Sequence, residues 1–193
     1  MYIISGNKKG RKIITPKRDF RPTQSKVREA FFNIVDAKDK VFLDLCSGSG
    51  AMGFEALSRN AKHVTMIEID KDAVKTIFLN AKNIFENDDT LYKIKRISAF
   101  DYVKKTNDKF DIIYLDPPYH SKIYLDTINS IVSKNILNEN GILTAEFGLD
   151  YYKKFLENEN FNDIICGIMK YDVKIYGESV LVIFQYINKG DTE

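Results

Sequence analysis

The chain of 193 residues is poor in the side chains that form disulfides and bind metal ions, because it has only two cysteines and two histidines. Cys46 and Cys166 lie far apart in the sequence. A disulfide framework needs more cysteines, and a structural zinc site usually needs four clustered ligands. We therefore expect two buried thiols in a reducing compartment and no bound metal ion.

Long apolar runs and internal repeats are also missing. No run approaches the roughly 20 residues that a membrane-spanning helix needs, and residues 1–6 lack the layout of a signal peptide. Hydrophobic residues make up 44% and charged residues 29%, which is the balance of an ordinary globular protein. We expect one cytoplasmic, monomeric domain without a membrane partner.

Charge is unevenly distributed along the chain, although the net charge is only +2. Residues 1–28 carry nine Lys or Arg and one acid, Asp19, which gives +8 for this segment and −6 for the remainder. A basic arm on a mildly acidic body is typical of proteins that bind a polyanion. A solvated, lysine-rich surface segment would have the same composition, so charge alone leaves both interpretations open.

Hydrophobic periodicity predicts strands that alternate with helices. Residues 1–22 should form a small basic hairpin and loop, and residues 23–193 the main fold, which begins with a helix. The predicted strands cover residues 41–45, 64–68, 92–97, 110–115, 142–147, 161–169 and 180–186. The predicted helices cover residues 51–59, 71–85, a short stretch from 99 or 100, 124–132 and 151–157.

This order of elements predicts a Rossmann-like α/β domain. Its sheet should have seven mostly parallel strands, helices on both faces and an antiparallel hairpin at one edge. In such sheets, ligands bind at the carboxyl ends of the strands, near the point where the strand order reverses. Residues that directly follow strands are therefore the candidates for function.

A glycine-rich turn follows the first strand. Gly48-x-Gly50-x-x-Gly53 matches a dinucleotide-binding fingerprint, and Glu68 ends the second strand, 18 residues after Gly50. An acid at that place can accept hydrogen bonds from ribose hydroxyls. Together these features predict a cofactor that contains adenosine. The alternative is a tight turn without a ligand, which Glu68 makes the weaker interpretation.

Asp44 distinguishes between two classes of cofactor. A carboxylate just before the turn would repel the diphosphate of a dinucleotide, whereas it suits a cofactor with a positively charged end. S-adenosylmethionine carries an ammonium and a sulfonium. The segment from Asp44 to Gly50 resembles the first motif of Rossmann-like methyltransferases, Asp-x-x-x-Gly-x-Gly.

Further residues complete the expected cofactor site. Asp101 follows the third strand, at the place of the acid that reads the adenine amino group in this superfamily; an ordinary helix cap is the alternative. The residues assigned to cofactor binding are Asp44, Ser47, Gly48, Gly50, Glu68, Ile69, Phe100 and Asp101.

The fourth strand ends at Asp116-Pro117-Pro118-Tyr119, the most specific signal in the chain. Two prolines after a strand make a stiff turn that cannot continue the sheet. The Asp116 carboxylate and the Pro117 carbonyl can accept both protons of an exocyclic amine, which orients its lone pair. Tyr119 can stack on the target base. Because a sulfonium methyl is already activated, the amine can displace it in line without a metal or a covalent nucleophile.

The Asp-Pro-Pro-Tyr tetrad is shared by amino-methyltransferases that act on adenine, guanine or glutamine. Other segments narrow the choice, because they resemble the RsmD-type family of bacterial 16S ribosomal RNA guanine-N2 methyltransferases. These segments are residues 3–6, 10–12, 21–23, 27–33, 44–50, 55–59, 116–119 and 176–178. The resemblance covers essentially the whole chain. Cys46-Ser47 departs from the Phe-Ala that the family often has.

The resemblance implies a class I methyltransferase that converts S-adenosylmethionine to S-adenosylhomocysteine and methylates guanine N2 in small-subunit ribosomal RNA. Its substrate would be the small ribosomal subunit or an assembly intermediate. Lys8, Lys9, Arg11 and Lys12 would contact phosphates. Arg21, Thr23 and Arg28 would lie over the cleft, although Arg28 could instead pair with an acid on its own helix.

Three other functions stay open at this point. A DNA adenine-N6 methyltransferase could use the same tetrad, but 193 residues leave no room for a separate recognition domain. An NAD-dependent oxidoreductase could use the glycines, but it does not account for the turn at Asp116. A non-catalytic RNA-binding module would not need the intact Asp44, Glu68 and Asp116.

Overall fold

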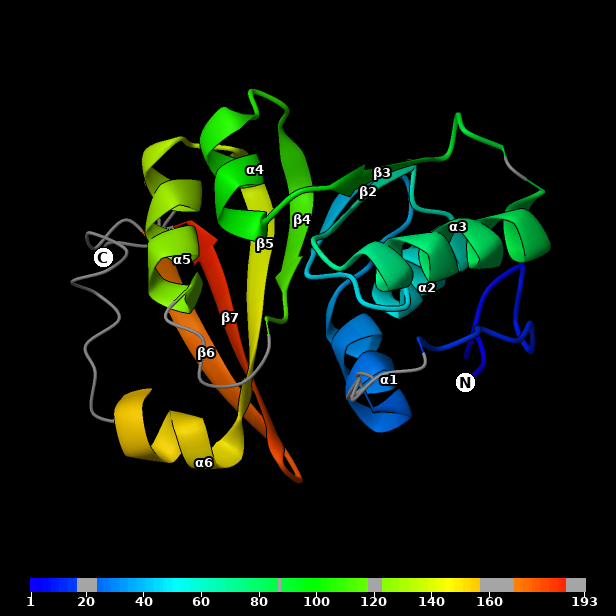
Figure 1. Cartoon of the computed structure of the whole chain (residues 1–193). Coiled ribbons are helices and arrows are strands. Elements are labelled where there is room, and N and C mark those ends of the chain that lie inside the picture. The colour runs from blue at the N-terminus through cyan, green and yellow to red at the C-terminus, as the bar shows by residue number, and fades with distance from the viewer. Residues whose placement is uncertain (17–23, 87, 118–122, 157–168, 187–193) are drawn as a thin grey trace.

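A seven-stranded sheet forms the centre of the protein (Figure 1). The computed structural model describes residues 1–16, 24–86, 88–117, 123–156 and 169–186. The strand order is β3-β2-β1-β4-β5-β7-β6, with β1 to β5 parallel and β7 antiparallel to both of its neighbours. The strands are β1 (Val41–Leu45), β2 (His63–Glu68), β3 (Tyr92–Arg96), β4 (Phe110–Leu115), β5 (Leu137–Gly148), β6 (Met169–Tyr176) and β7 (Ser179–Tyr186).

Helices cover both faces of this sheet (Figure 1). On one face lie α1 (Ser25–Ile34), α2 (Ala51–Ser58) and α3 (Lys71–Phe85); on the other lie α4 (Ala99–Lys105), α5 (Ile123–Ser133) and the short α6 (Leu149–Tyr151), which continues as the π-helical turn Tyr152–Leu156. None of the described helices has the length and apolar character needed to cross a membrane.

The alternation of side chains along the strands explains the two-sided core. Phe42 and Tyr114 point into the cluster under α1 to α3, whereas their neighbours Leu43 and Ile113 point into the cluster under α4 and α5. Because both faces are buried, these strands are almost continuously hydrophobic. The predicted fold class is therefore confirmed, including the seven strands and the antiparallel edge.

The edge hairpin differs from the prediction in its first strand. β6 covers Met169–Tyr176, and only Met169 belongs to the predicted strand 161–169; residues 161–168 lie outside the described residues. Pairing with β7 determines this register, since the turn at Gly177 and Glu178 joins Tyr176 to Ser179. Met169 is the only buried residue of this edge strand, so β6 lacks the continuous apolar run on which the prediction relied.

The N-terminal segment and the last helix also differ in detail. The two predicted N-terminal strands form one isolated antiparallel bridge, Tyr2 with Lys12, supported by a backbone bond from Ile3 to Arg11 at 3.0 Å. The helix predicted at 151–157 begins at Leu149 and becomes π-helical at Tyr152. Neither difference affects the strands whose carboxyl ends carry the candidate site residues.

The strand order places the functional candidates together. The chain passes from β1 to β2 on one side and later enters β4 on the other side of β1. In register, Leu45 of β1 lies between Ile67 of β2 and Leu115 of β4. The residues that follow these three strands therefore meet at the switch point, where α/β sheets bind ligands.

Candidate active site

The loop after β1 is a tight, hydrogen-bonded turn that leads into α2. Cys46, Gly48 and Gly50 all have positive φ, at 66°, 56° and 80°. A Cβ on Gly50 would stand 2.6 Å from the ring of Phe54, so glycine is required there. The buried Ser47 hydroxyl donates to the Asp44 carbonyl at 2.8 Å, which holds the turn closed.

Asp44 lies beneath this loop with 2% of its surface exposed. Its carboxylate accepts a hydrogen bond from the Gly53 backbone at 3.1 Å, so it joins the end of β1 to the first turn of α2. Burial raises the pKa of Asp44 to about 7, the negative charge of Glu68 adds to the rise, and the bond from Gly53 opposes it. A cationic ligand would relieve this cost by stabilising the charged form.

Glu68 joins β2 to the glycine-rich loop. Its carboxylate accepts three backbone hydrogen bonds, from Gly48 at 2.8 Å, Ile69 at 2.7 Å and Asp70 at 2.9 Å. Ile69 is 62% exposed beside it, which is unusual for isoleucine. These three bonds fix the carboxylate at the carboxyl end of β2.

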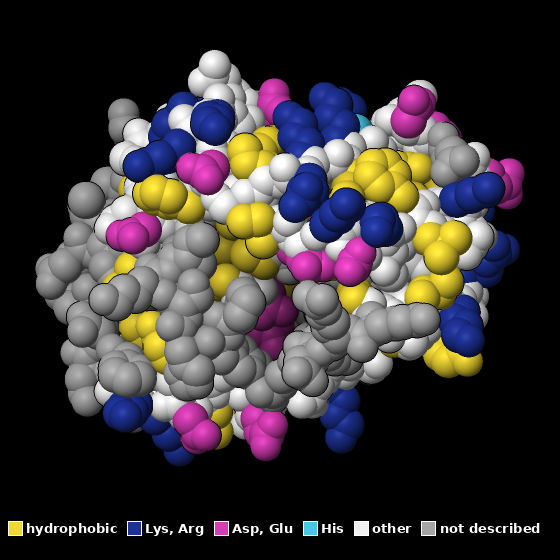
Figure 2. All heavy atoms as spheres, in the orientation of Figure 1, with side chains coloured by type: hydrophobic (Ala, Val, Ile, Leu, Met, Phe, Trp, Pro, Cys, Tyr) yellow, Lys and Arg dark blue, Asp and Glu magenta, His cyan; other side chains and the backbone are white. Residues whose placement is uncertain are grey.

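Three acidic side chains affect the thiol of Cys46. Burial raises the pKa of the Cys46 thiol well above its ordinary value, and the carboxylates of Glu68, Asp116 and Asp44 raise it further. Figure 2 shows Asp and Glu side chains inside a hollow in the middle of this face, where Figure 1 has the carboxyl end of β4. In the described residues, no three acids, histidines or cysteines form a group that could hold a metal ion. Because carboxylates gather there, the hollow suits a cation such as the ammonium and sulfonium of S-adenosylmethionine.

Asp101 serves as part of a helix cap. The Ser98 hydroxyl at the N-cap of α4 accepts from the Asp101 backbone at 3.1 Å and donates to Asp101 Oδ2 at 2.7 Å. The neighbouring half-buried Phe100 has the Lys104 ammonium 4.1 Å from its ring centroid. The capping role is a finding; the contact with adenine stays a prediction.

Hydrogen bonds hold the first two residues of the turn after β4. The Asp116 backbone donates to the Leu45 carbonyl at 3.2 Å, which places Asp116 beside the end of β1. The Pro117 carbonyl accepts from the Tyr124 hydroxyl at 2.9 Å. Tyr119 lies outside the described residues, so its stacking role stays a prediction.

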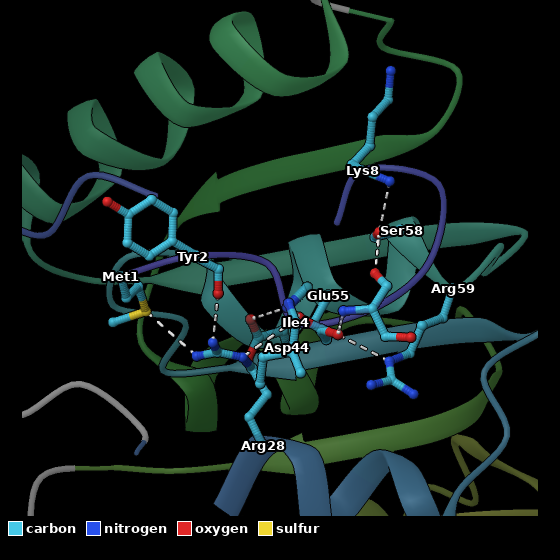
Figure 3. Close-up of polar contacts among 11 residues, drawn as sticks. Met1, Tyr2, Ile4, Lys8, Arg28, Asp44, Glu55, Ser58 and Arg59 are labelled. Carbon is cyan, nitrogen blue, oxygen red and sulfur yellow. Dashed lines mark hydrogen bonds and ion pairs between the residues drawn. The ribbon is translucent and has the colours of Figure 1, made fainter. Parts of the chain in front are cut away.

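The N-terminal arm, residues 1–16, is docked on α2. The Glu55 carboxylate, which has no exposed surface, accepts from the backbones of Ile4 at 2.8 Å and Ser5 at 2.9 Å (Figure 3). One turn later, the Ser58 hydroxyl donates to the Ser5 carbonyl at 2.5 Å and accepts from the Lys8 backbone at 3.0 Å. These contacts give a structural role to residues 55–59, a segment that carries the family resemblance but had no predicted function.

The structure corrects the role predicted for Arg28 as an RNA contact. It lies on the buried stripe of α1, has no exposed surface, and pairs with Glu55 of α2 at 3.6 Å (Figure 3). Its guanidinium also donates to the Tyr2 carbonyl at 2.8 Å. Burial lowers the Arg28 pKa, while Glu55 opposes that shift. Arg28 therefore anchors the arm and cannot reach RNA; its partner is not an acid on its own helix.

The other predicted RNA contacts are on the arm. Lys9, Arg11 and Lys12 are exposed and Lys8 is half-buried. The Lys8 ammonium lies 5.8 Å from the Phe85 ring centroid, and the Arg11 guanidinium donates to the Asn83 carbonyl of α3. Arg21 and Thr23 lie outside the described residues.

Asn80 of α3 is a buried residue that the sequence did not single out. Its side chain accepts from the Ile14 backbone at 2.8 Å and donates to the Ile14 carbonyl at 2.9 Å. It also donates to the Ser49 carbonyl at 3.0 Å. Asn80 thus joins the arm to the glycine-rich loop. An amide on the apolar stripe of a helix was the one local signal that could have marked it.

The fold and this site define a class of protein. A parallel sheet with an antiparallel edge, a glycine-rich loop after β1, an acid at the end of β2 and an Asp-Pro-Pro turn after β4 form the Rossmann-like architecture of class I methyltransferases. A putative methyltransferase from Escherichia coli has the same fold, with a TM-score of 0.81 and 24% sequence identity over 98% of this chain and 99% of that one.

The chain belongs to the family described as Conserved hypothetical protein 95, whose model matches residues 1–185. It is 39% identical over 150 residues to ribosomal RNA small subunit methyltransferase D of Buchnera aphidicola subsp. Acyrthosiphon pisum, covering 76% of this chain and 77% of that protein. It is 33% identical over 197 aligned positions to the protein of that name from Escherichia coli K12, covering 99% and 92%. The predicted RsmD-type resemblance is confirmed, and the chain is a methyltransferase of this family.

Proposed function

We propose that this protein transfers a methyl group from S-adenosylmethionine to the exocyclic N2 of a guanine in small-subunit ribosomal RNA. The bond from the Asp116 backbone to Leu45 supports the proposal most directly, because it holds Asp116 beside the end of β1, where the glycine-rich loop begins. The printed names of the relatives, ribosomal RNA small subunit methyltransferase D, support the RNA substrate.

The cofactor would be held by the acidic edge of the sheet. Asp44 and Glu68 offer buried and half-buried carboxylates to its positive end and its ribose, and the backbone of Gly48 to Gly50 allows close approach. Ile69, Phe100 and Asp101 would flank its adenine. When bound, S-adenosylmethionine supplies a sulfonium methyl that an amine can displace directly.

The residues of this chain then have to position the amine. The Asp116 carboxylate and the Pro117 carbonyl accept hydrogen bonds from its two N–H groups, which directs the nitrogen lone pair away from the turn. Asp116 also stabilises the positive charge that develops on the nitrogen and can accept the departing proton. Tyr119 stacks on the guanine ring.

The substrate would be the small ribosomal subunit or its assembly intermediate, bound by a monomer. Residues 1–22 form the basic hairpin and loop that includes the N-terminal arm. In the arm, Lys8, Lys9, Arg11 and Lys12 contact RNA phosphates, and Arg21 and Thr23 contact the RNA near the cleft. Residues 23–193 form the catalytic domain. Arg28 is excluded from the RNA contacts by its burial.

The experiment that tests this function is methyl transfer from labelled S-adenosylmethionine to 30S particles from cells that lack the endogenous enzyme. Nucleoside analysis should give N2-methylguanosine in small-subunit RNA. Transfer to duplex DNA with N6-methyladenine as product, and none to 30S particles, would retain the mechanism and overturn the substrate.

A further inference from the structure

Beyond β4, the carbonyl of Pro117 needs a hydrogen-bond donor that the sheet does not supply. The β4–β5 pairing ends at Leu115 with Ala145. Pro117 has no N–H, so the ladder cannot continue. The carbonyl oxygens of Pro117 and Glu146 both lie within hydrogen-bond distance of the Tyr124 hydroxyl and share its single proton.

The Tyr124 hydroxyl stands between these two carbonyls. It lies 2.9 Å from the Pro117 oxygen and 2.8 Å from the Glu146 oxygen, and the side chain is 1% exposed. The ring is held by Phe147, with ring centroids 4.3 Å apart, and by Tyr151 at 6.0 Å. The hydroxyl thus takes the place of the missing ladder bond and connects the catalytic turn to β5.

The β5 side of this connection is itself fixed. The Glu146 carboxylate, 2% exposed, accepts from the Tyr114 hydroxyl at 2.5 Å and from the Ser179 hydroxyl at 2.9 Å. These bonds join β4, β5 and β7 behind the site. A buried, hydrogen-bonded network of this kind is rigid because each member restrains the next.

We propose that Tyr124 is a positioning residue for methyl transfer. Its hydroxyl fixes the Pro117 carbonyl in the orientation that accepts a hydrogen bond from one N–H of the target amine. Asp116 is restrained from the β1 side by Leu45, and Pro117 is restrained from the β5 side by Tyr124. The two acceptors of the amine are therefore held from opposite sides. Since the acceptor role of Pro117 belongs to the proposed function, this inference rests on it.

The test compares two substitutions that each remove one buried hydroxyl. Tyr124→Phe removes the donor to Pro117, whereas Tyr102→Phe removes a buried hydroxyl of α4 that accepts from Thr106. With 30S particles as substrate, Tyr124→Phe should lower kcat by about tenfold to a hundredfold, the loss expected from a slightly misplaced reacting group. The KM for 30S particles and the Kd for S-adenosylhomocysteine should stay within about twofold. Tyr102→Phe should retain kcat.

The outcomes separate positioning from mere stability. Equal kcat for Tyr124→Phe and wild type, or an equal loss in both variants, would overturn the proposal. Replacement of Tyr124 by 4-aminophenylalanine keeps a donor at the same place and should restore the rate. 4-Fluorophenylalanine fills the space without a donor and keeps the test available if Tyr124→Phe does not fold.

Failure of the proposed function would be seen separately, in the wild-type protein. If the wild type methylates duplex DNA and not 30S particles, the guanine substrate is wrong. The ratio of variant to wild-type kcat, measured on that DNA, still decides the role of Tyr124.

Discussion

The side-chain amide of Asn80 donates a hydrogen bond to the backbone carbonyl of Ser49 at 3.0 Å, so α3 supports the glycine-rich loop from behind. The same side chain holds both backbone groups of Ile14. We therefore expect Asn80→Ala to weaken S-adenosylhomocysteine binding about tenfold and to destabilise the fold by about 2–4 kcal/mol, because buried backbone groups lose their partners. Calorimetric titration and urea unfolding measure the two effects. Asn83→Ala, an exposed residue one turn later, is the matched control; equal effects in both variants would contradict this role.

Asp116→Ala should abolish methyl transfer while cofactor binding is retained. The carboxylate acts on the amine and on the charge that develops there, an effect that typically contributes a factor of about a hundred or more to kcat. Single-turnover rates and the Kd for S-adenosylhomocysteine are the measurements. A loss of cofactor affinity as large as the loss of rate would assign Asp116 to the cofactor instead.

Cofactor affinity should rise with pH through about 7. The pKa of Asp44 is raised to about 7 in the folded protein, so the carboxylate is largely protonated below that pH and attracts the cofactor's ammonium less. The Kd for S-adenosylhomocysteine from pH 5.5 to 8.5 tests this, and Asp44→Asn should bind weakly at every pH. A wild-type Kd that is constant across neutral pH would remove Asp44 from the site.

The same shift has a consequence for stability without cofactor. An acid whose pKa is raised on folding favours the folded state most below its unfolded pKa of about 4, and this contribution is lost as pH rises toward 7. The free energy of unfolding of Asp44→Asn should therefore fall less than that of the wild type between these limits. Urea unfolding at pH 5 and pH 7 provides the comparison.

Charge reversal of the arm should weaken RNA binding and flatten its salt dependence. Each phosphate contact contributes about 0.7–0.9 to the slope of log K against log salt, so changing Lys8, Lys9, Arg11 and Lys12 to Glu should reduce the slope by about three. Binding of 30S particles across salt concentrations measures it. Charge reversal of the exposed Lys105, Lys109, Lys134 and Lys153 on the opposite face is the control for net charge. An unchanged slope in the arm variant would exclude the arm from the interface.

Arg28 and Glu55 should act as a unit in stability. Glu55→Gln leaves a buried guanidinium without its counter-charge, which should cost about 3–5 kcal/mol in the free energy of unfolding. Arg28→Met combined with Glu55→Gln should recover part of that loss, since the uncompensated charge is gone. Urea unfolding of the two single variants and the double variant measures the coupling, and strictly additive losses would show that the pair is not coupled.

The parts of this protein that local sequence patterns predict are the strands, the helices and the two turns that carry motifs. Hydrophobic segments were enough to locate six of the seven strands, because an apolar strand between two amphipathic helices has to be buried on both faces, whereas the edge strand β6 begins at the last residue of its predicted range. The glycines after β1 and the prolines after β4 act through their own backbone, so their effect needs no distant partner. Asp44 and Glu68 lie at the carboxyl ends of their strands and Asp116 follows its strand, and parallel pairing brings these strand ends to one edge.

Only the tertiary structure determined the contacts between residues that lie far apart in the sequence. Arg28 looked like an RNA contact on a basic segment, yet the docking of α1 beside α2 buries it against Glu55. Asn80 reaches Ile14 from 66 positions away, and the Tyr124 hydroxyl finds the carbonyls of Pro117 and Glu146. Such contacts depend on how whole elements pack, and packing is determined by the shapes of many side chains at once, so no local pattern in the chain contains them.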